Sequence, residues 1–163
     1  MLPDMGITAV FRNLGNMSKI GLLHHKNQGI IKDVCTRITD KEILKKGRVH
    51  PIQVLSALLT YGQGHGTRGS GEWDTMPDVM DALDDAFYLA FDNVQPTGKR
   101  YLLGIDVSSS MGGREVAGVV GLTPCMGAAA MTMVFYRTEQ SVVPMAFCNE
   151  FTPFNITLKM LLR

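Results

Sequence analysis

Residues 101–110 place the tightest constraint on what this chain can fold into. Their sequence, Tyr-Leu-Leu-Gly-Ile-Asp-Val-Ser-Ser-Ser, runs from apolar, β-type residues into an Asp-x-Ser-x-Ser loop. A helix rich in alanine and methionine is predicted shortly afterwards, over residues 123–137. A strand, a polar loop and a helix in this order begin an open α/β sheet, in which ligands bind at the carboxyl ends of the strands.

Asp106, Ser108 and Ser110 occupy alternate positions in the loop after the predicted strand. A tight loop can turn their side-chain oxygens toward one point, and oxygen ligands suit a hard divalent cation such as Mg²⁺. The same residue types are also ordinary turn and helix-cap residues that need no metal. The sequence therefore predicts either a magnesium site or a plain turn at the end of this strand.

The charge of the chain is unevenly distributed along its 163 residues, although the net charge is only +1. Residues 1–75 carry ten Lys and Arg against six Asp and Glu, a net charge of +4, whereas residues 76–163 carry six against nine, a net charge of −3. A basic first part is typical of proteins that meet a polyanion. Two solvated surfaces of different composition explain the asymmetry equally well.

No signal peptide and no apolar run of membrane-spanning length is predicted, so we expect no membrane partner. The three cysteines, Cys35, Cys125 and Cys148, are widely spaced and fit no zinc pattern. We expect them to be reduced thiols of an intracellular protein.

Short amphipathic helices are predicted in the first part of the chain. Apolar periodicity indicates helices over residues 7–23 and 29–38. Asp40 is expected to cap a short third helix that Gly47 ends, and a fourth is expected over residues 51–61. Successive short helices with short joints indicate an α-solenoid or a helical bundle.

Residues 62–75 form a glycine-rich segment that contains a misleading match. Residues 64–69, Gly-His-Gly-Thr-Arg-Gly, fit the dinucleotide fingerprint, but a helix is predicted before them where the fingerprint requires a strand. We therefore expect a loop here. Asp74 or Thr75 is expected to cap the next helix, with Pro77 in its first turn.

The end of the chain is predicted to complete only part of an α/β unit. Residues 142–148 indicate a strand, which Pro144 should confine to a sheet edge. Residues 151–154 are expected to pair back as a hairpin, and Thr157 is expected to cap a helix from Leu158. A parallel sheet needs more strands and two covered faces, so we expect a segment of a longer protein.

The sequence resembles the sixty-kilodalton Ro autoantigen family of RNA-binding proteins, the TROVE-module family. The resemblance runs over nearly the whole chain and includes motifs of both the helical-repeat module and the von Willebrand factor A-type domain of that family. The matching segments, in chain order, are Phe-Arg-Asn-Leu-Gly-Asn-Met at 11–17, Arg-Val-His-Pro at 48–51, Tyr61 with residues 64–69, Pro-Thr-Gly-Lys-Arg at 96–100, and the adhesion-site motif at 106–110.

The resemblance implies a mixed fold: an α-helical segment of HEAT-like repeats followed by an incomplete α/β von Willebrand factor A-type (Rossmann-like) domain. Residues 1–75 would be the C-terminal part of the TROVE helical-repeat module, and residues 76–98 a connecting helix and turn. Residues 99–163 would be the truncated N-terminal part of the A-type domain. Most of the helical module would precede residue 1.

The resemblance also implies a function. Proteins of this family bind small noncoding Y RNAs and the single-stranded ends of misfolded noncoding RNAs, act in RNA quality control, and are cytoplasmic and nuclear ribonucleoproteins that are not known as enzymes. Asp106, Ser108 and Ser110 match the first loop of the metal-ion-dependent adhesion site. The family adds a Thr and an Asp from later loops, and Thr123 does not occupy the place of that Thr.

Individual RNA contacts do not carry over from the family, so RNA-binding residues are inferred from charge and ring chemistry alone. Unpaired bases stack on aromatic rings, which makes Tyr61 and Trp73 candidates, whereas Phe11 is expected in the core. The candidate cations for RNA phosphates are Lys19, Lys45, Lys46, Arg48 and Arg68.

Two other functional classes stay open on the sequence. The first is a magnesium-dependent adhesion module that captures an acidic group of a protein partner. The second is an enzyme, which we consider the weaker hypothesis because the four histidines all lie away from Asp106 in the sequence.

Overall fold

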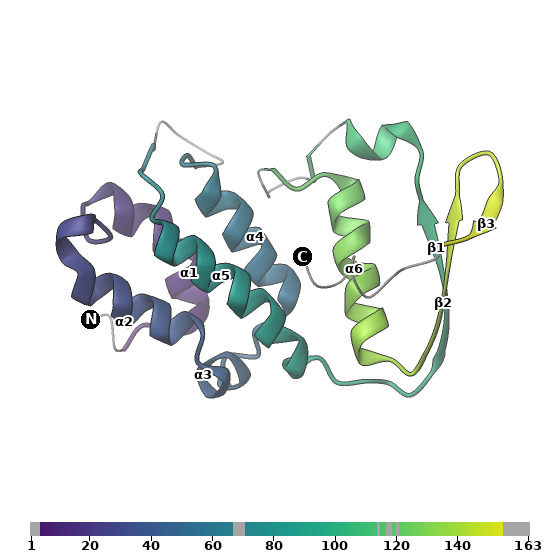
Figure 1. Cartoon of the computed structure of the whole chain (residues 1–163), viewed down its shortest axis with the longest axis horizontal. Helices are drawn as coiled ribbons and strands as arrows, with labels where there is room; N and C mark the ends of the chain where they lie inside the picture. The colour runs from purple at the N-terminus through teal and green to yellow at the C-terminus, as the bar shows by residue number, and fades with distance from the viewer. Residues whose placement is uncertain (1–3, 67–70, 114, 117–118, 120, 155–163) are drawn as a thin grey trace. The chain divides into compact units, whose positions relative to one another are not determined.

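The computed structural model describes residues 4–66, 71–113, 115–116, 119 and 121–154. The chain divides into two compact units, a helical unit up to Asn93 and an α/β unit that takes most of the chain from Val94 onward. Both are drawn in Figure 1. This architecture agrees with the expected combination of a helical segment and a partial α/β domain.

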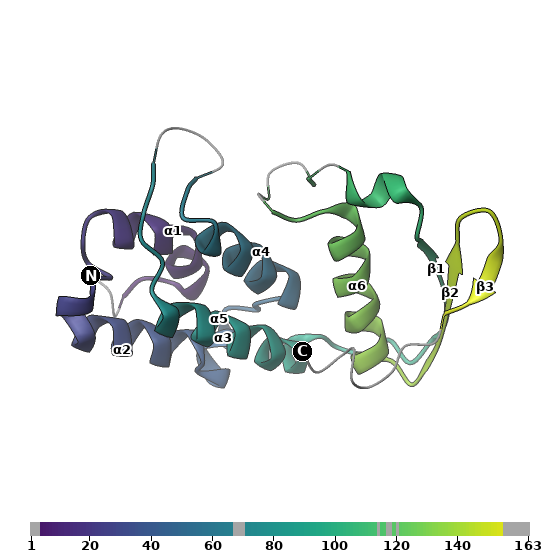
Figure 2. The same cartoon turned by 45° about the horizontal axis from the view of Figure 1, so that its top comes forward.

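In its described residues, the helical unit contains five α-helices and two 3₁₀ turns. In Figure 2, α1 and α4 form one layer and α2 and α5 the other, with α5 packed against both α2 and α4. The expected connecting segment 76–98 therefore contributes a helix to this unit. The elements are α1 (Ile7–Lys19), η1 (His25–Asn27), α2 (Gln28–Ile38), α3 (Lys41–Lys46), α4 (Pro51–Gly62), α5 (Pro77–Leu89) and η2 (Ala90–Asn93).

Local sequence chemistry fixes most helix starts. The Asp40 carboxylate accepts a 2.9 Å hydrogen bond from the Ile43 N–H and caps α3, as predicted. At α4, His50 and Gln53 form a reciprocal capping box ahead of Pro51. The prediction of an Asp74 or Thr75 cap on α5 was wrong, because Met76 holds that position and its N–H bonds elsewhere.

Tyr61, near the end of α4, joins three segments of the helical unit. Its hydroxyl lies 2.8 Å from the Ser18 hydroxyl at the end of α1 and accepts a 3.0 Å hydrogen bond from the Met76 N–H just before α5. Its backbone carbonyl accepts a 3.0 Å hydrogen bond from the Trp73 indole. The residue is 2% exposed, so these polar contacts are made away from water. The neighbouring core consists of Val10, Leu14, Val34, Ile38, Leu44, Val54, Val79 and Leu83.

As far as the structure describes it, the α/β unit is a three-stranded sheet with one α-helix against it. Its elements are β1 (Arg100–Asp106), η3 (Ser109–Gly112), α6 (Pro124–Thr138), β2 (Ser141–Phe147) and β3 (Phe151–Pro153), in the strand order β1-β2-β3. β1 and β2 are parallel, as a strand–helix–strand crossover requires, and β3 returns as the predicted antiparallel hairpin. The helix predicted from Leu158 lies outside the described residues.

The prediction that Pro144 marks an edge strand was wrong, since β2 is the central strand. The Pro144 carbonyl accepts a 3.0 Å hydrogen bond from Phe154 on the β3 side. The nitrogen and the carbonyl of one strand residue point the same way, so the missing N–H also faces that side. The proline therefore takes no donor away from the ladder between β1 and β2, which leaves that ladder intact.

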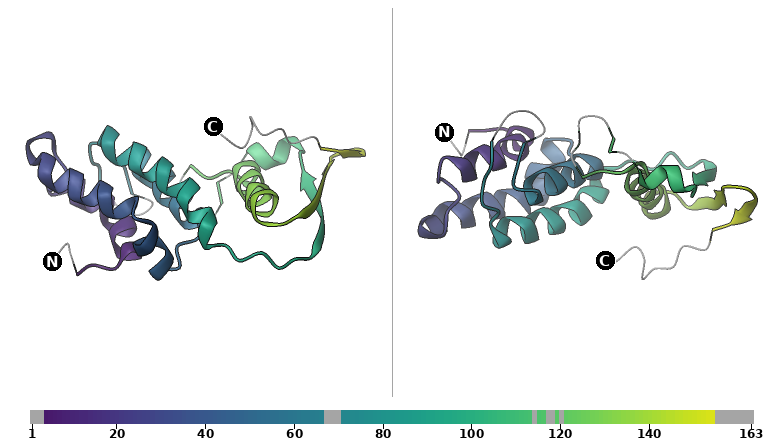
Figure 3. Two further views of the ribbon diagram at one scale, coloured as in Figure 1. Left: turned by 60° about the horizontal axis from the view of Figure 1, so that its bottom comes forward. Right: turned by 90° about the horizontal axis from the view of Figure 1, so that it is seen from above.

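Side-chain alternation gives the sheet two different faces. Figure 3 shows α6 against one side, where Ile105 and Ala146 of the strands are buried with Ala130 and Val134 of the helix. On the other side Leu102 is 67% exposed, and no helix among the described residues covers that face. None of the described helices is both long enough and apolar enough to span a lipid bilayer.

We expect Tyr61→Phe to lower the free energy of unfolding of the helical unit by about 1–3 kcal/mol, because it leaves a buried hydroxyl and a buried N–H without their partner. Urea unfolding followed by the fluorescence of Trp73, the single tryptophan, measures this loss. Tyr136→Phe, at an exposed position of α6 in the α/β unit, is the control and should change the stability of the helical unit by less than about 0.5 kcal/mol. Equal stability of the two variants would contradict the role assigned to Tyr61.

A second prediction concerns Glu139, whose carboxylate accepts hydrogen bonds from the Thr97 N–H at 2.8 Å and the Gly98 N–H at 3.1 Å. The Thr97 bond is the main cause that holds the pKa of Glu139 below its ordinary value of 4.5. Such a carboxylate stabilises the fold above its ordinary pKa, and the stabilisation disappears as the pH falls through the lowered folded-state value. We therefore expect the Tm difference between wild type and Glu139→Gln to shrink as the pH falls below about 4.5.

Thermal unfolding followed by circular dichroism across this pH range measures that difference. Glu150→Gln, in the exposed turn before β3, is the control and should show no such pH-dependent convergence. A constant difference for Glu139→Gln at every pH would mean that the charge of Glu139 does not matter.

Candidate functional site

The loop after β1 brings Asp106, Ser108 and Ser110 together as the sequence predicted. An Asp106 carboxylate oxygen accepts a 2.9 Å hydrogen bond from the Ser108 N–H, which is the local turn that Asp favours. The hydroxyls of Ser108 and Ser110 lie 2.9 Å apart. The Val107 N–H donates to the Phe147 carbonyl at 3.0 Å, so the loop is fastened to the end of β2.

The electrostatics of this loop favour an ionised carboxylate. Hydrogen bonds from Ser108, the backbone N–H first and the hydroxyl second, hold the pKa of the Asp106 carboxyl below its ordinary value. The described residues contain no cluster of three His, Cys, Asp or Glu side chains that could hold a metal ion. One carboxylate and two hydroxyls fit only a hard cation that keeps several waters, which is the behaviour of Mg²⁺.

The candidate phosphate-binding cations fall into two places on the helical unit. Lys45, Lys46 and Arg48 are exposed at the end of α3 and in the turn before α4, where Arg48 has a positive φ of 49°. Lys19 is exposed at the last residue of α1, near the opposite end of α4, where it lines a hollow with Trp73. Arg68 lies outside the described residues.

The charge argument also changes once the boundary of the unit is known. α5 and η2 belong to the helical unit and bring five further aspartates, so residues 1–93 carry ten Lys and Arg against eleven Asp and Glu. The net positive charge of residues 1–75 therefore does not describe a folded unit. An argument for RNA binding from charge must therefore rest on where the charged side chains lie on the helices.

Of the aromatic candidates, only Trp73 keeps an accessible ring. Phe11 is 8% exposed and belongs to the core, as expected. Tyr61 was wrong as a stacking candidate, because its ring is buried and its hydroxyl is used inside the fold. Trp73 is half-buried, and its ring is stacked on Tyr61 with the centroids 6.4 Å apart.

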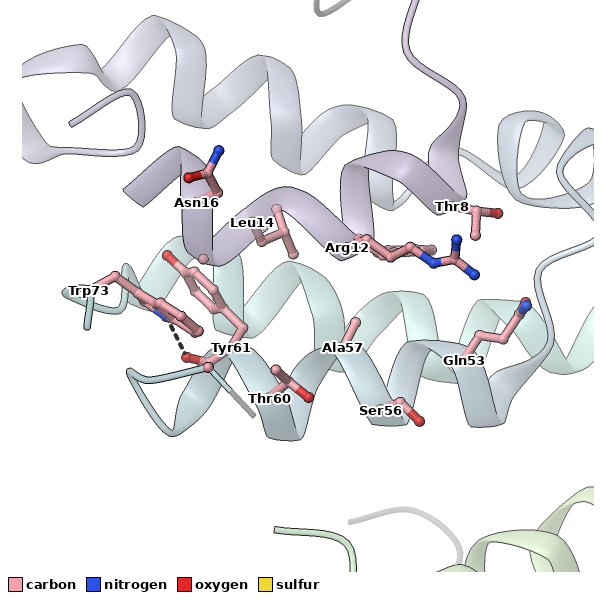
Figure 4. Close-up of a pocket in the computed structure, with 13 residues that line it drawn as sticks. Thr8, Arg12, Leu14, Asn16, Gln53, Ser56, Ala57, Thr60, Tyr61 and Trp73 are labelled. Carbon is pink, nitrogen blue, oxygen red and sulfur yellow. Dashed lines mark hydrogen bonds between the residues drawn. The ribbon is translucent and has the colours of Figure 1, made fainter. Parts of the chain in front are cut away.

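A groove between α1 and α4 was missed by sequence reasoning. This α1–α4 groove has a volume of about 550 Å³, and Figure 4 shows its side chains along the two helices. Its two rows of residues lie far apart in the sequence, so no motif marks them as one surface. The 3.6-residue spacing within each row was the available signal. The lining is Thr8, Phe11, Arg12, Leu14, Gly15, Asn16, Gln53, Ser56, Ala57, Thr60, Tyr61, Gly66 and Trp73.

The residues of the dinucleotide-like match take a different structure from a nucleotide-binding turn. α4 precedes them, and His65 forms an isolated antiparallel bridge with Glu72. No helix starts in the described residues after them until Pro77. The rejection of a dinucleotide site therefore agrees with the local fold.

Family comparisons follow the two parts of the chain. Residues 2–60 match the TROVE domain, and residues 100–163 match the Ro60 vWA domain. These matches fall in the helical unit and the α/β unit, respectively, as the structure describes them.

Individual relatives match across both parts. The chain is 49% identical over 152 residues to the RNA-binding protein RO60 of Deinococcus radiodurans, covering 93% of this chain and 29% of that protein. It is 39% identical over 155 residues to the RNA-binding protein RO60 of Caenorhabditis elegans, covering 94% of this chain and 23% of that protein. The chain thus spans about a quarter to a third of the length of these relatives.

A solved structure shows the same fold. The crystal structure of the Deinococcus radiodurans RO (RSR) protein superimposes with a TM-score of 0.90 at 47% sequence identity, covering 96% of this chain and 32% of that one. Sequence, domain order and fold agree along the whole matched region. The chain therefore belongs to the Ro family of proteins, in which a TROVE domain is followed by a Ro60-type von Willebrand factor A domain.

Proposed function

We propose that this protein is an RNA-binding component of a ribonucleoprotein and that its helical unit makes the RNA contact. The observation that carries this proposal is the 49% identity to a protein named RNA-binding protein RO60, with the TROVE match over the helical unit. The exposed cations at the end of α3 supply charges that RNA phosphates attract. Small noncoding Y RNAs and misfolded noncoding RNAs, met in the cytoplasm and the nucleus, are the proposed ligands.

Two of the four described histidines have a structural role that supports binding without catalysis. The ring nitrogen Nδ1 of His24 accepts a hydrogen bond from the Lys26 N–H, and that of His50 accepts one from the Ile52 N–H. Each is thus engaged in capping a helix start. Burial lowers the pKa of His50, which keeps it in the neutral form that can accept this bond.

We expect RNA affinity to fall steeply with salt, and we expect Lys45→Gln with Lys46→Gln to reduce the salt dependence. Removing one phosphate–cation pair from a complex with single-stranded RNA lowers the slope of log K against log salt by about 0.7. Filter binding of a Y RNA and of an RNA with a single-stranded end, over a salt series, measures both effects. Lys99→Gln in the α/β unit is the control and should leave the slope unchanged.

Salt-independent binding by the wild-type chain would overturn the RNA proposal. A double variant with the wild-type slope would instead exclude only Lys45 and Lys46 as phosphate contacts.

For the α/β unit we propose a magnesium ion on Asp106, Ser108 and Ser110. The support is the set of three side-chain oxygens gathered by the loop, with a carboxylate whose pKa is lowered. A hard cation with so few protein ligands keeps open coordination positions. The second candidate function, capture of an acidic group of a protein partner, uses such a position.

We expect Mg²⁺ at about ten times its Kd to raise the free energy of unfolding of the α/β unit by about 1.4 kcal/mol, because a ligand that binds only the folded state stabilises it. Asp106→Asn should abolish this gain, whereas Asp84→Asn, at an exposed position of α5, should keep it. Thermal unfolding with Mg²⁺ and with chelator gives the comparison. An unchanged melting curve of the wild-type chain in the two conditions would rule out a site on this loop.

A further inference from the structure

We infer that the α1–α4 groove seats an unpaired stretch of RNA, with Arg12 on a phosphate and the polar side chains of both helices on bases and riboses. This inference rests on the proposed RNA-binding function and assigns it a surface. Unpaired nucleotides would contact the groove, whereas the exposed cations around α3 would make a separate contact with RNA phosphates.

Two rows of polar side chains, neutral except for Arg12, face the groove. Thr8, Arg12 and Asn16 follow one another at four-residue spacing on α1, so they share one face of that helix. Gln53, Ser56 and Thr60 form a similar row on α4, as Figure 4 shows. Amides and hydroxyls both donate and accept, which suits base edges and the ribose 2′-hydroxyl.

The charge of the lining is positive. Arg12 is the single charged residue in it, and the lining contains no carboxylate among the described residues. Within the part of the chain that the structure describes, Arg12 is exposed and makes no ion pair, so its guanidinium is available. A guanidinium binds phosphate through two parallel N–H bonds, which gives both affinity and orientation.

An exposed cation lies near each end of α1. Gly47, which directly precedes Arg48, packs against Ile7 at the start of α1. Lys19, at the other end of α1, lines a second hollow with Trp73, and Glu72 and Asp74 also line that hollow. A strand that runs along α1 thus passes from one exposed cation, over Arg12, to another.

The floor and one end are apolar and rigid. Leu14 and Ala57 line the floor, and Trp73 closes one end. The indole of Trp73 is fixed by its hydrogen bond to the Tyr61 carbonyl and fits against Gly15, where an added Cβ would lie 2.7 Å from the ring. A preformed aromatic surface allows a base to stack whatever its identity.

The opposite layer of the helical unit provides an internal comparison. The hollow between α2 and α5 has a similar volume, about 520 Å³, but it is lined by Asp78, Asp81 and Asp85 with Lys32 as its one cation among the described residues. Three carboxylates repel a phosphate backbone. The layer formed by α1 and α4 is therefore the side on which RNA can lie.

The size of the groove favours unpaired nucleotides. A volume of about 550 Å³ lies within the usual range of small-ligand sites, and it admits single bases rather than a helix. The bases of a duplex are stacked and paired inside it, so a duplex meets only the rim. We therefore expect discrimination between single-stranded and double-stranded RNA of equal length.

The test is a fluorescence titration of the full chain, with Trp73 as the reporter. The two ligands are a ten-nucleotide uridine oligomer and a blunt-ended RNA duplex of the same length. The wild-type chain should bind the oligomer with quenching of Trp73 and bind the duplex more weakly. Arg12→Gln should weaken oligomer binding by about tenfold, the loss expected for a charged hydrogen bond, and Thr60→Val by about threefold.

Matched controls separate this contact from general electrostatics. Lys26→Gln removes one exposed positive charge outside the groove, and Thr36→Val removes one hydroxyl from the α2 side. Both should change oligomer binding by less than about twofold. Circular dichroism of each variant verifies that the helices are retained.

The outcomes distinguish this inference from the function on which it rests. If the wild-type chain binds RNA but Trp73 does not respond, or Arg12→Gln and Lys26→Gln weaken binding equally, the groove is not the RNA site and the proposed function stands. If the wild-type chain binds neither RNA, the proposed function fails and the inference with it. Quenching by an acidic peptide but not by the oligomer would assign the groove to a protein partner.

Discussion

The buried hydroxyl of Tyr61 holds the helical unit together at one end. It joins Ser18 at the end of α1 to the Met76 N–H that begins α5, while the Tyr61 carbonyl holds the Trp73 indole. These four residues come from three segments that are remote in sequence. Each contact satisfies a polar group that would be costly to bury alone. The position of α1 against α4, and hence the groove between them, depends on this arrangement.

The two helix layers of the helical unit present different charges. The α1–α4 layer presents Arg12 among neutral polar groups, whereas the α2–α5 hollow presents three aspartates. The unit as a whole is close to neutral, so the two sides differ in charge although the total is small. The net charge of residues 1–75 does not show this difference, because the aspartates of α5 belong to the same folded unit as the basic helices before it.

In the α/β unit, the structure of the loop after β1 is set mainly by contacts between residues that are close in the sequence. Asp106 ends β1 and takes the Ser108 N–H, so the loop geometry is set within three residues. α6 buries one face of the sheet through Ile105 and Ala146. The opposite face keeps large apolar side chains in contact with water, and exposed apolar surface of this kind is typical of surfaces that other protein segments cover. The unit thus combines a locally determined loop with a sheet whose packing is one-sided among the described residues.

Local signals made much of the helical unit and the site predictable. The Asp40 cap, the prolines at the first turns of α4 and α5, and the alternating Asp106 loop are each decided by neighbours within four residues. The family motifs likewise indicated the correct order of the two parts. Signals that combine a local rule with the position of a strand or helix in the fold were less reliable. Pro144 lies in the central strand because its missing N–H faces away from β1, which sequence cannot reveal.

What the sequence alone determined is therefore the family, the order of the elements, and the oxygen-rich loop after β1, because these follow from local patterns and motifs. The tertiary structure decided which side chains meet. It buried Tyr61, left Trp73 at the end of a groove, and placed the row of Arg12 on α1 beside the row of Thr60 on α4. Residues remote in sequence face each other only when two helices pack, and the packing is governed by buried apolar faces rather than by the polar rows themselves.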